Sequence, residues 1–221
     1  MENKKSSNPS KLRQWLENFW YYYKYHTIVS IVVAFALVVS VTQCASRVDY
    51  DYQFVLATSS AEMVPTQIEG LKNELLKYVE DENGDGEINI NIIDCSFSEK
   101  DSARQIIEGK RQKIQSIAMK EENILIFLMD KACFDWLESV FKNGFAEDLA
   151  LSNENGKYFP LSDTAFYENA KKDFDSGYKW PKELLLTRRI VKGTLIENSG
   201  NIDECVARAD KIVKNIIKAY R

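Results

Sequence analysis

The hydrophobic pattern divides the chain into one long apolar run and a following region of shorter, mixed segments. Residues 27–42 (TIVSIVVAFALVVSVT) are apolar on every side, and no Asp, Glu, Lys or Arg occurs from 25 to 46. A helix of a soluble domain would keep a polar face, which this run lacks. The 22 residues from 25 to 46 would form a helix of roughly 33 Å, long enough to cross a bilayer. The pattern therefore predicts a transmembrane helix over residues 25–46.

An aromatic and basic leader precedes this run. Large apolar residues follow helical spacing in the leader: Leu12, Trp15, Leu16, Phe19, Trp20 and Tyr23. This spacing predicts an amphipathic helix at the inner membrane surface. Residues 1–24 carry five basic and two acidic residues, whereas residues 47–221 carry 24 basic and 31 acidic ones. Because positively charged flanks stay in the cytoplasm, we expect residues 1–24 inside the cell and residues 47–221 outside.

Two other signals could explain an apolar run near the N-terminus. A cleaved secretory signal would end near Cys44-Ala45-Ser46, but the leader is longer and more aromatic than such signals are. A lipoprotein signal would use Cys44, but Gln43 stands where a small residue is expected. An uncleaved signal anchor, which makes a single-pass protein of the cell membrane, fits the sequence better than either alternative.

Beyond residue 47 the chain alternates between short strands and amphipathic helices. A continuous apolar run such as residues 123–129 (NILIFLM) is typical of a strand buried on both faces. The predicted order is strand 49–58, helix 65–79, strand 88–92, helix 103–118, strand 123–129, helix 134–141, a short helix at 164–172, strand 183–194 and helix 201–220. This order predicts one α/β domain over residues 47–221, with a mostly parallel sheet and helices on both faces.

Polar side chains follow the ends of three predicted strands: Thr58, Ser59, Ser60, Asp94 and Asp130. The carboxyl ends of parallel strands meet at one edge of a sheet, where ligands commonly bind. These residues are therefore candidates for holding a small polar or cationic solute. The alternative is that the Ser and Asp side chains cap the helices that follow.

A loop rich in carboxylates precedes the second predicted strand. Asp81, Asn83 and Asp85 place side-chain oxygens at alternate positions, Gly86 allows a sharp turn, and Glu87 offers a backbone carbonyl. A hard cation such as calcium takes oxygen ligands of this kind. An EF-hand would need a bidentate Glu at the twelfth position, which is Ile92 here, so this loop is not an EF-hand. The sequence allows a structural calcium site or a plain solvated turn.

The positions of the Cys and His residues limit which catalytic sites, metal sites and disulfides the chain can form. The only His, His26, lies at the edge of the predicted span, so the outer domain has no His for a Ser-His-Asp arrangement or a zinc site. Cys95 and Cys133 each follow a predicted strand, and they could form a disulfide outside the cell or serve as core residues. A pair of carboxylates could still hydrolyse a glycoside, but no pair stands out among the abundant acidic residues.

The chain resembles a group of small single-pass membrane proteins of Firmicutes. The resemblance rests on the leader FWYYYKYH at 19–26, the loop DENGDG at 81–86 and the strand ILIFLMD at 124–130. The order of elements in residues 47–221 is also similar to part of an extracellular solute-binding protein of the ABC-transporter type. This resemblance implies a periplasmic-binding-protein-like fold and a solute or a membrane protein as partner.

These features predict a membrane-anchored extracytoplasmic protein that binds or scaffolds and does not catalyse. A cell-surface hydrolase that uses paired carboxylates is one alternative, and a docking subunit of a membrane complex is another. The net charge of −7 over residues 47–221 argues against nucleic acid as a partner. The expected partners are the lipid bilayer and an unidentified small solute or membrane protein.

Overall fold

The computed structural model describes residues 11–45, 48–100, 102–141, 144–145, 156–172 and 177–220. The chain forms two compact units, residues 1–48 and residues 49–221. The first ten residues of the predicted leader lie outside the described residues. Each unit is considered by itself below.

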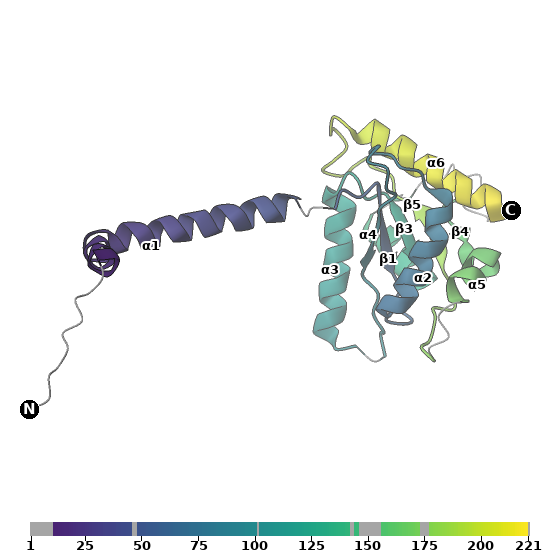
Figure 1. Ribbon diagram of the computed structural model, residues 1–221. Helices are drawn as coiled ribbons and strands as arrows, with labels where there is room; N and C mark the ends of the chain where they lie inside the picture. Colours follow the sequence, from purple (N-terminus) through teal and green to yellow (C-terminus); the bar gives the residue numbers. More distant parts are fainter. Residues whose placement is uncertain are drawn as a thin grey trace, which may run out of the picture. The chain divides into compact units, whose positions relative to one another are not determined.

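The first unit is one long helix, α1 (Lys11–Ala45), as Figure 1 shows. Residues 11–24 of the leader and residues 25–45 of the predicted span therefore form one continuous helix. The segment Arg13–Thr42 is long and apolar enough to cross a membrane, and a signal sequence would pass the same test. Hydroxyl groups within the apolar part donate to the helix itself, as Ser40 does to the carbonyl of Ala36 at 2.8 Å. Such bonding satisfies a polar group without water, as the interior of a bilayer requires.

The second unit is built on a mixed sheet of five strands in the order β2-β1-β3-β5-β4. The strands are β1 (Tyr52–Ala57), β2 (Ile90–Asp94), β3 (Ile126–Met129), β4 (Phe159–Pro160) and β5 (Leu185–Arg188). β1 pairs in parallel with β2 and β3, whereas β5 runs antiparallel to both β3 and β4. The prediction of an α/β domain is confirmed. The prediction of a mostly parallel sheet is wrong, because β5 enters the sheet in the opposite direction and makes two of the four strand pairings antiparallel.

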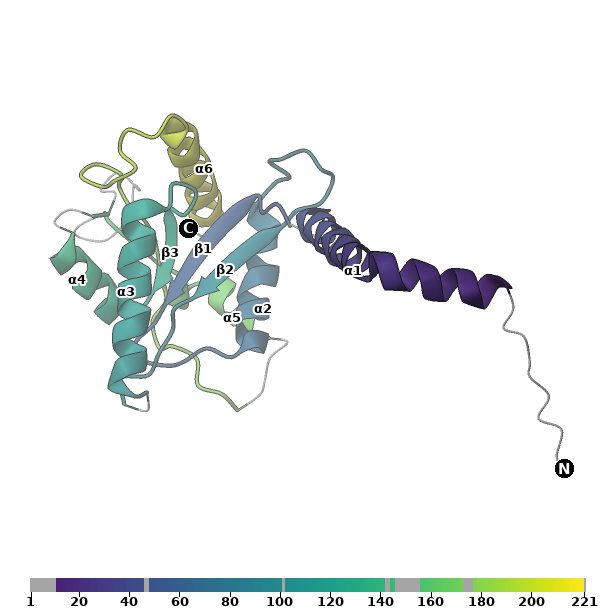
Figure 2. The ribbon, with the colours of Figure 1, turned by 90° about the vertical axis from the view of Figure 1, so that its left-hand side faces the viewer.

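Helices cover both faces of the sheet (Figures 1 and 2). They are α2 (Pro65–Leu75), α3 (Arg104–Lys120), α4 (Lys131–Val140), α5 (Ala165–Lys171) and α6 (Ile202–Tyr220), with short 3-10 turns at Leu76–Tyr78 and Leu161–Asp163. One core joins α2, α5 and α6 to the sheet face of Phe54 and Leu56. The other joins α3 and α4 to the face of Val55 and Phe127. Burial on both faces explains why β1 and β3 are continuously apolar in sequence.

Candidate functional site

Asp130 lies at the centre of the sheet edge where β1 and β3 end. Its Oδ2 accepts hydrogen bonds from the backbone N–H of Ser59 at 2.7 Å, the N–H of Ser60 at 3.0 Å and the hydroxyl of Ser59 at 3.1 Å. Its Oδ1 accepts the N–H of Cys133 at 2.9 Å and so caps α4. The Asp130 side chain is buried. The loop amides and the helix terminus that could receive a ligand here already hold the protein's own carboxylate.

The pairing of β1 with β2 continues past the ends of both strands. The N–H of Cys95 donates to the carbonyl of Leu56 at 2.8 Å, and the N–H of Phe97 donates to the carbonyl of Thr58 at 2.8 Å. A third bond joins the N–H of Glu99 to the carbonyl of Ser59 at 3.0 Å. These bonds hold the loops after β1 and β2 together at the carboxyl edge. The crevice expected for this strand order lies between β1 and β3, where Asp130 binds Ser59.

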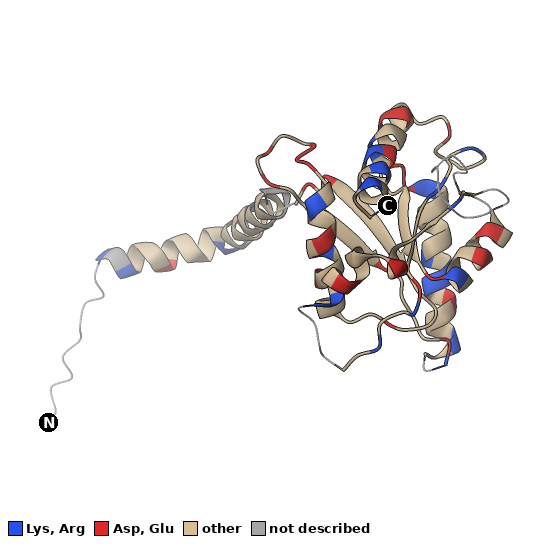
Figure 3. Cartoon of the chain, turned by 90° about the vertical axis from the view of Figure 1, so that its right-hand side faces the viewer, with Lys and Arg blue, Asp and Glu red and all other residues tan. Residues whose placement is uncertain are grey.

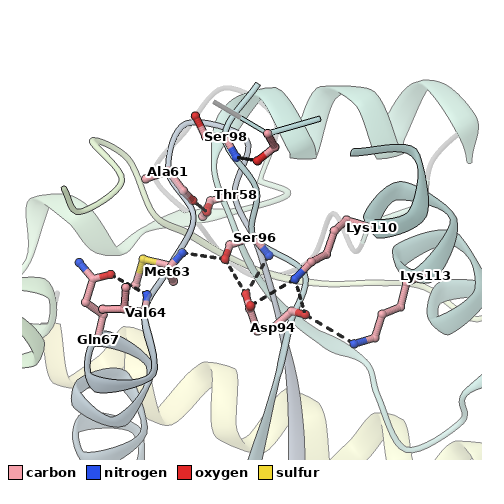
Figure 4. A network of polar contacts seen from close by, with 11 residues as sticks. Thr58, Ala61, Met63, Val64, Gln67, Asp94, Ser96, Ser98, Lys110 and Lys113 are labelled. Atoms are coloured by element: carbon pink, nitrogen blue, oxygen red, sulfur yellow. Dashed lines mark hydrogen bonds and ion pairs between the residues drawn. The ribbon is translucent and has the colours of Figure 1, made fainter. Parts of the chain in front are cut away.

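Asp94 belongs to a neighbouring network, drawn in Figure 4. Its Oδ1 accepts the N–H of Ser96 at 2.8 Å and the hydroxyl of Ser96 at 2.6 Å, while its Oδ2 lies 3.3 Å from Nζ of Lys110. The Ser96 hydroxyl in turn accepts the N–H of Met63 at 2.8 Å. Thr58 donates to the carbonyl of Ala61 at 2.7 Å. The network ties the segment before α2 to the end of β2.

The five candidate ligand residues thus form two adjoining sets, one around Asp130 with Ser59 and Ser60, and one around Asp94. Thr58 and Ser59 are buried, and Ser60 is exposed. Three of the four bonds to Asp130 come from backbone N–H groups, one of them in the first turn of α4, which favours the helix-capping alternative for Asp130. A solute at this edge stays a prediction.

The loop at 81–87 folds on itself through its polar side chains. The carboxylate of Asp81 accepts the N–H groups of Gly84 at 2.7 Å and of Gly86 at 2.8 Å. Asn83 accepts the N–H of Asp85, and Asp85 accepts the N–H of Glu87, both at 2.8 Å. Gly84 and Gly86 take φ values of 74° and 88°, which glycine adopts without strain. Acidic residues colour most of this loop in Figure 3.

Calcium at this loop stays a prediction. Among the residues that the structure describes, no three His, Cys, Asp or Glu side chains are grouped so that they could hold a metal ion. The predicted oxygens of Asp81, Asn83 and Asp85 do share one loop, but their contacts are with its own N–H groups.

Asp51 fastens the loop to the sheet, and the sequence analysis missed it. Its Oδ1 accepts the N–H groups of Glu82 at 2.9 Å and Asn83 at 3.0 Å, and its Oδ2 accepts that of Asn89 at 2.7 Å. Burial alone would raise the pKa of Asp51, but the three backbone N–H groups outweigh burial and lower it. The only signal in the sequence was an acidic residue directly before a buried strand.

The three cysteines of the second unit are free and buried. The structure therefore contains no Cys95–Cys133 disulfide, and both thiols belong to the core between the sheet and the helices α3 and α4. Burial raises the pKa of Cys95 and of Cys133, and the nearby carboxylate of Asp130 adds to the shift at Cys133. A raised pKa keeps both thiols protonated and unreactive at neutral pH.

Two cavities lie at the opposite edge of the sheet, where β1 and β3 begin. One has a volume of about 240 Å³ between the ends of α3 and α4 and the segment after β5, and we name it the Arg189 cavity. The other, about 300 Å³, lies between the starts of β1 and β3 and the first turns of α6. There the thiol of Cys205 donates to Oδ1 of Asn123 at 3.1 Å. Neither cavity includes a residue of the predicted carboxyl-edge site.

Comparison with protein-family models, with curated proteins and with solved structures finds no match to this chain. The functional argument therefore rests on the residues and on the geometry above.

Proposed function

We propose that the chain is a single-pass membrane protein with its N-terminus in the cytoplasm and an extracytoplasmic domain over residues 49–221. One observation carries this proposal. In α1 the large apolar side chains stay exposed, as Ile31 and Phe35 do at 62% and 69%, and the helix is joined to a separately packed α/β unit. Exposed apolar surface of this length is stable in lipid and costly in water.

We further infer that the outer domain binds a partner and does not hydrolyse one. Asp94 and Asp130, the carboxylates at the strand ends, are engaged by the protein's own groups, which supports binding over carboxylate-driven hydrolysis. The parallel order of β1, β2 and β3 is compatible with the inferred likeness to part of a solute-binding protein. The bilayer and a small solute or membrane protein are the proposed partners.

Cysteine labelling on intact cells tests the topology. Lys11 and Lys182 are both exposed, one on α1 and the other in the outer domain. A membrane-impermeant maleimide should label Lys182→Cys in intact cells and Lys11→Cys only after lysis. The native thiols of the outer domain are buried and give a low background. Labelling of Lys11→Cys in intact cells, with Lys182→Cys protected, would reverse the topology.

The mass of the membrane-extracted protein separates an anchor from a cleaved signal. An anchor keeps residues 1–46, whereas cleavage near Ala45 or lipidation of Cys44 removes the leader and the apolar run. We expect the intact mass to include the leader.

A further inference from the structure

Arg189 is a buried cation with an unused hydrogen-bond donor. It follows β5 in extended conformation, and its backbone N–H donates to the carbonyl of Leu125 at 2.9 Å. The guanidinium reaches the end of α3, where Nη2 donates to the carbonyl of Glu121 at 2.8 Å and Nε donates to that of Ile124 at 3.3 Å. The residue is 3% exposed. Its Nη1 is buried and has no hydrogen-bond partner among the residues that the structure describes.

The charge of Arg189 also lacks a close counter-ion. No ion pair joins it to a carboxylate within the described part of the chain, and its guanidinium donates to the neutral carbonyl groups of Glu121 and Ile124. Burial lowers the pKa of Arg189 to about 10, against a weaker opposing effect of Glu121. The guanidinium therefore stays charged at neutral pH. A buried charge without a partner is costly, so an anion at this position would be strongly favoured.

The preceding residue shows how this fold treats an arginine that serves structure alone. Arg188 points to the other face of the sheet, is buried to a similar degree, and forms an ion pair with Asp210 of α6. The two adjacent arginines thus differ in their partners: Arg188 pairs with a carboxylate, and Arg189 has no carboxylate partner among the described residues.

The Arg189 cavity adds the shape of a binding site. It is lined by Arg189 and Lys192 and by apolar side chains that include Leu137, Val140, Phe141 and Phe145. No acidic residue is among its lining residues in the described part of the chain. A volume of about 240 Å³ lies just below the usual range for small-molecule pockets, so it suits a compact ligand. The lining is positive at one side and apolar elsewhere.

We infer that the Arg189 cavity binds a small carboxylic acid that carries a short apolar chain or ring. The carboxylate accepts hydrogen bonds from the guanidinium of Arg189, Lys192 supplies a second positive charge, and the apolar part packs against Val140 and Phe141. Arg189 lines the cavity and is largely shielded from water, so a carboxylate beside its guanidinium would form a charge-assisted bond in a medium of low dielectric. This inference rests on the proposed binding function and gives it a ligand class and a site.

Hexanoate and its neutral isostere hexanamide are the probes, titrated by calorimetry into the full chain in nanodiscs. Hexanoate should bind saturably, and hexanamide should bind about tenfold more weakly or worse, because it brings no charge to Arg189. Val140→Trp fills the cavity at a partly exposed position that tolerates a larger side chain, and it should abolish binding. The same titration into nanodiscs that hold Val140→Trp also measures the heat of hexanoate partitioning into lipid, which is the background for the wild-type titration.

Two lysines that flank β5 give a matched pair of charge variants. Lys192 lines the cavity, whereas Lys182 is an exposed lysine at the other end of the strand. Lys192→Ala should weaken hexanoate binding a few-fold, and Lys182→Ala should leave it unchanged. Arg189→Gln should lose the preference for hexanoate over hexanamide.

Three results would overturn the inference: no saturable hexanoate binding to the wild-type chain, equal affinity for hexanamide, or unchanged affinity in Val140→Trp. None of them alters the labelling pattern at positions 11 and 182. A reversed labelling pattern would in turn leave the affinity unchanged, so the two proposals fail separately.

Discussion

The two edges of the sheet use their polar groups in opposite ways. At the carboxyl edge, Asp130 satisfies two loop amides, a hydroxyl and the first turn of α4 with one carboxylate. At the amino edge, Arg189 is similarly buried, lies beside a cavity, and has a donor with no partner among the residues that the structure describes. A polar group that is fully bonded within the protein stabilises the fold. A buried donor without a partner costs free energy, and a ligand that accepts its hydrogen bond would recover that cost. The carboxyl edge, where ligands commonly bind in a parallel sheet, here has its carboxylates bonded to the protein's own groups.

Removal of Asp130 should have the largest effect on stability. Asp130→Ala leaves three N–H groups and one hydroxyl at the carboxyl edge without their acceptor. We expect a loss of about 3 kcal/mol, or roughly 6–12 °C in Tm, in thermal unfolding of the full chain in detergent. Asp135→Ala is the control, because Asp135 is exposed and pairs only with Lys131 on the same helix. Equal stability of the two variants would contradict a structural role for this edge.

Removal of Asp51 should have the second-largest effect on stability, because Asp51 holds the 81–89 segment to the start of β1. Asp51→Ala removes the acceptor of three N–H groups and should cost about 2 kcal/mol. Hydrogen exchange should rise at Glu82, Asn83 and Asn89 and stay unchanged around Asp130. A uniform rise over the whole domain would show that Asp51 acts on the fold and not on the loop.

The free energy of unfolding should fall in acid, because two carboxylates have lowered pKa values in the folded state. The pKa of Asp51 is lowered by backbone amides, and that of Glu74 is lowered because Lys77, Tyr220 and Asn169 outweigh its burial. A lowered pKa in the folded state gives stability that is present above the unfolded value and lost as the pH falls through the folded one. The loss should therefore occur below the ordinary values of 3.8 and 4.5. Glu74→Gln should flatten the acid limb of a plot of Tm against pH, and an unchanged acid limb would contradict this assignment.

Calcium should have the smallest effect of the four. If the 81–87 loop binds the ion, calcium should raise Tm by a few degrees over chelator, and Asp85→Ala should abolish the shift while the apo Tm stays close to wild type. The side chains of this loop already accept its own N–H groups, so the ion adds little to an ordered turn. A Tm that does not respond to calcium would leave a plain solvated turn.

The sequence predicted the elements well because burial on both faces produces continuous apolar runs. β1, β3 and the helices α2 to α6 all fall within or near the predicted ranges. The direction of β5 was harder to predict, because the run at 183–194 has the same hydrophobic pattern whether the strand is parallel or antiparallel to its neighbours. The path of the preceding connection decides that direction, and β5 is antiparallel to β3 as a result.

The sequence predicted that the candidate residues share one edge of the sheet, and a solute there stays a prediction. The strand ends of β1 and β3 bring Ser59 and Asp130 together, as the parallel order implies. Whether Asp130 faces a ligand or an amide depends on the loop path, which no periodicity encodes. The sequence analysis did not single out Arg189, because both Arg188 and Arg189 lie within the predicted strand 183–194. Their adjacency was the available signal, since alternation places one arginine on each buried face.

Hydrogen exchange of the full chain with and without hexanoate tests the contrast between the edges most directly. The account predicts added protection in segments around the Arg189 cavity, at residues 118–124 and 189–194, with no change at 58–64 or 130–134. Protection at 58–64 and 130–134 instead, with none beside Arg189, would place the binding edge at the carboxyl ends of the strands and contradict the account.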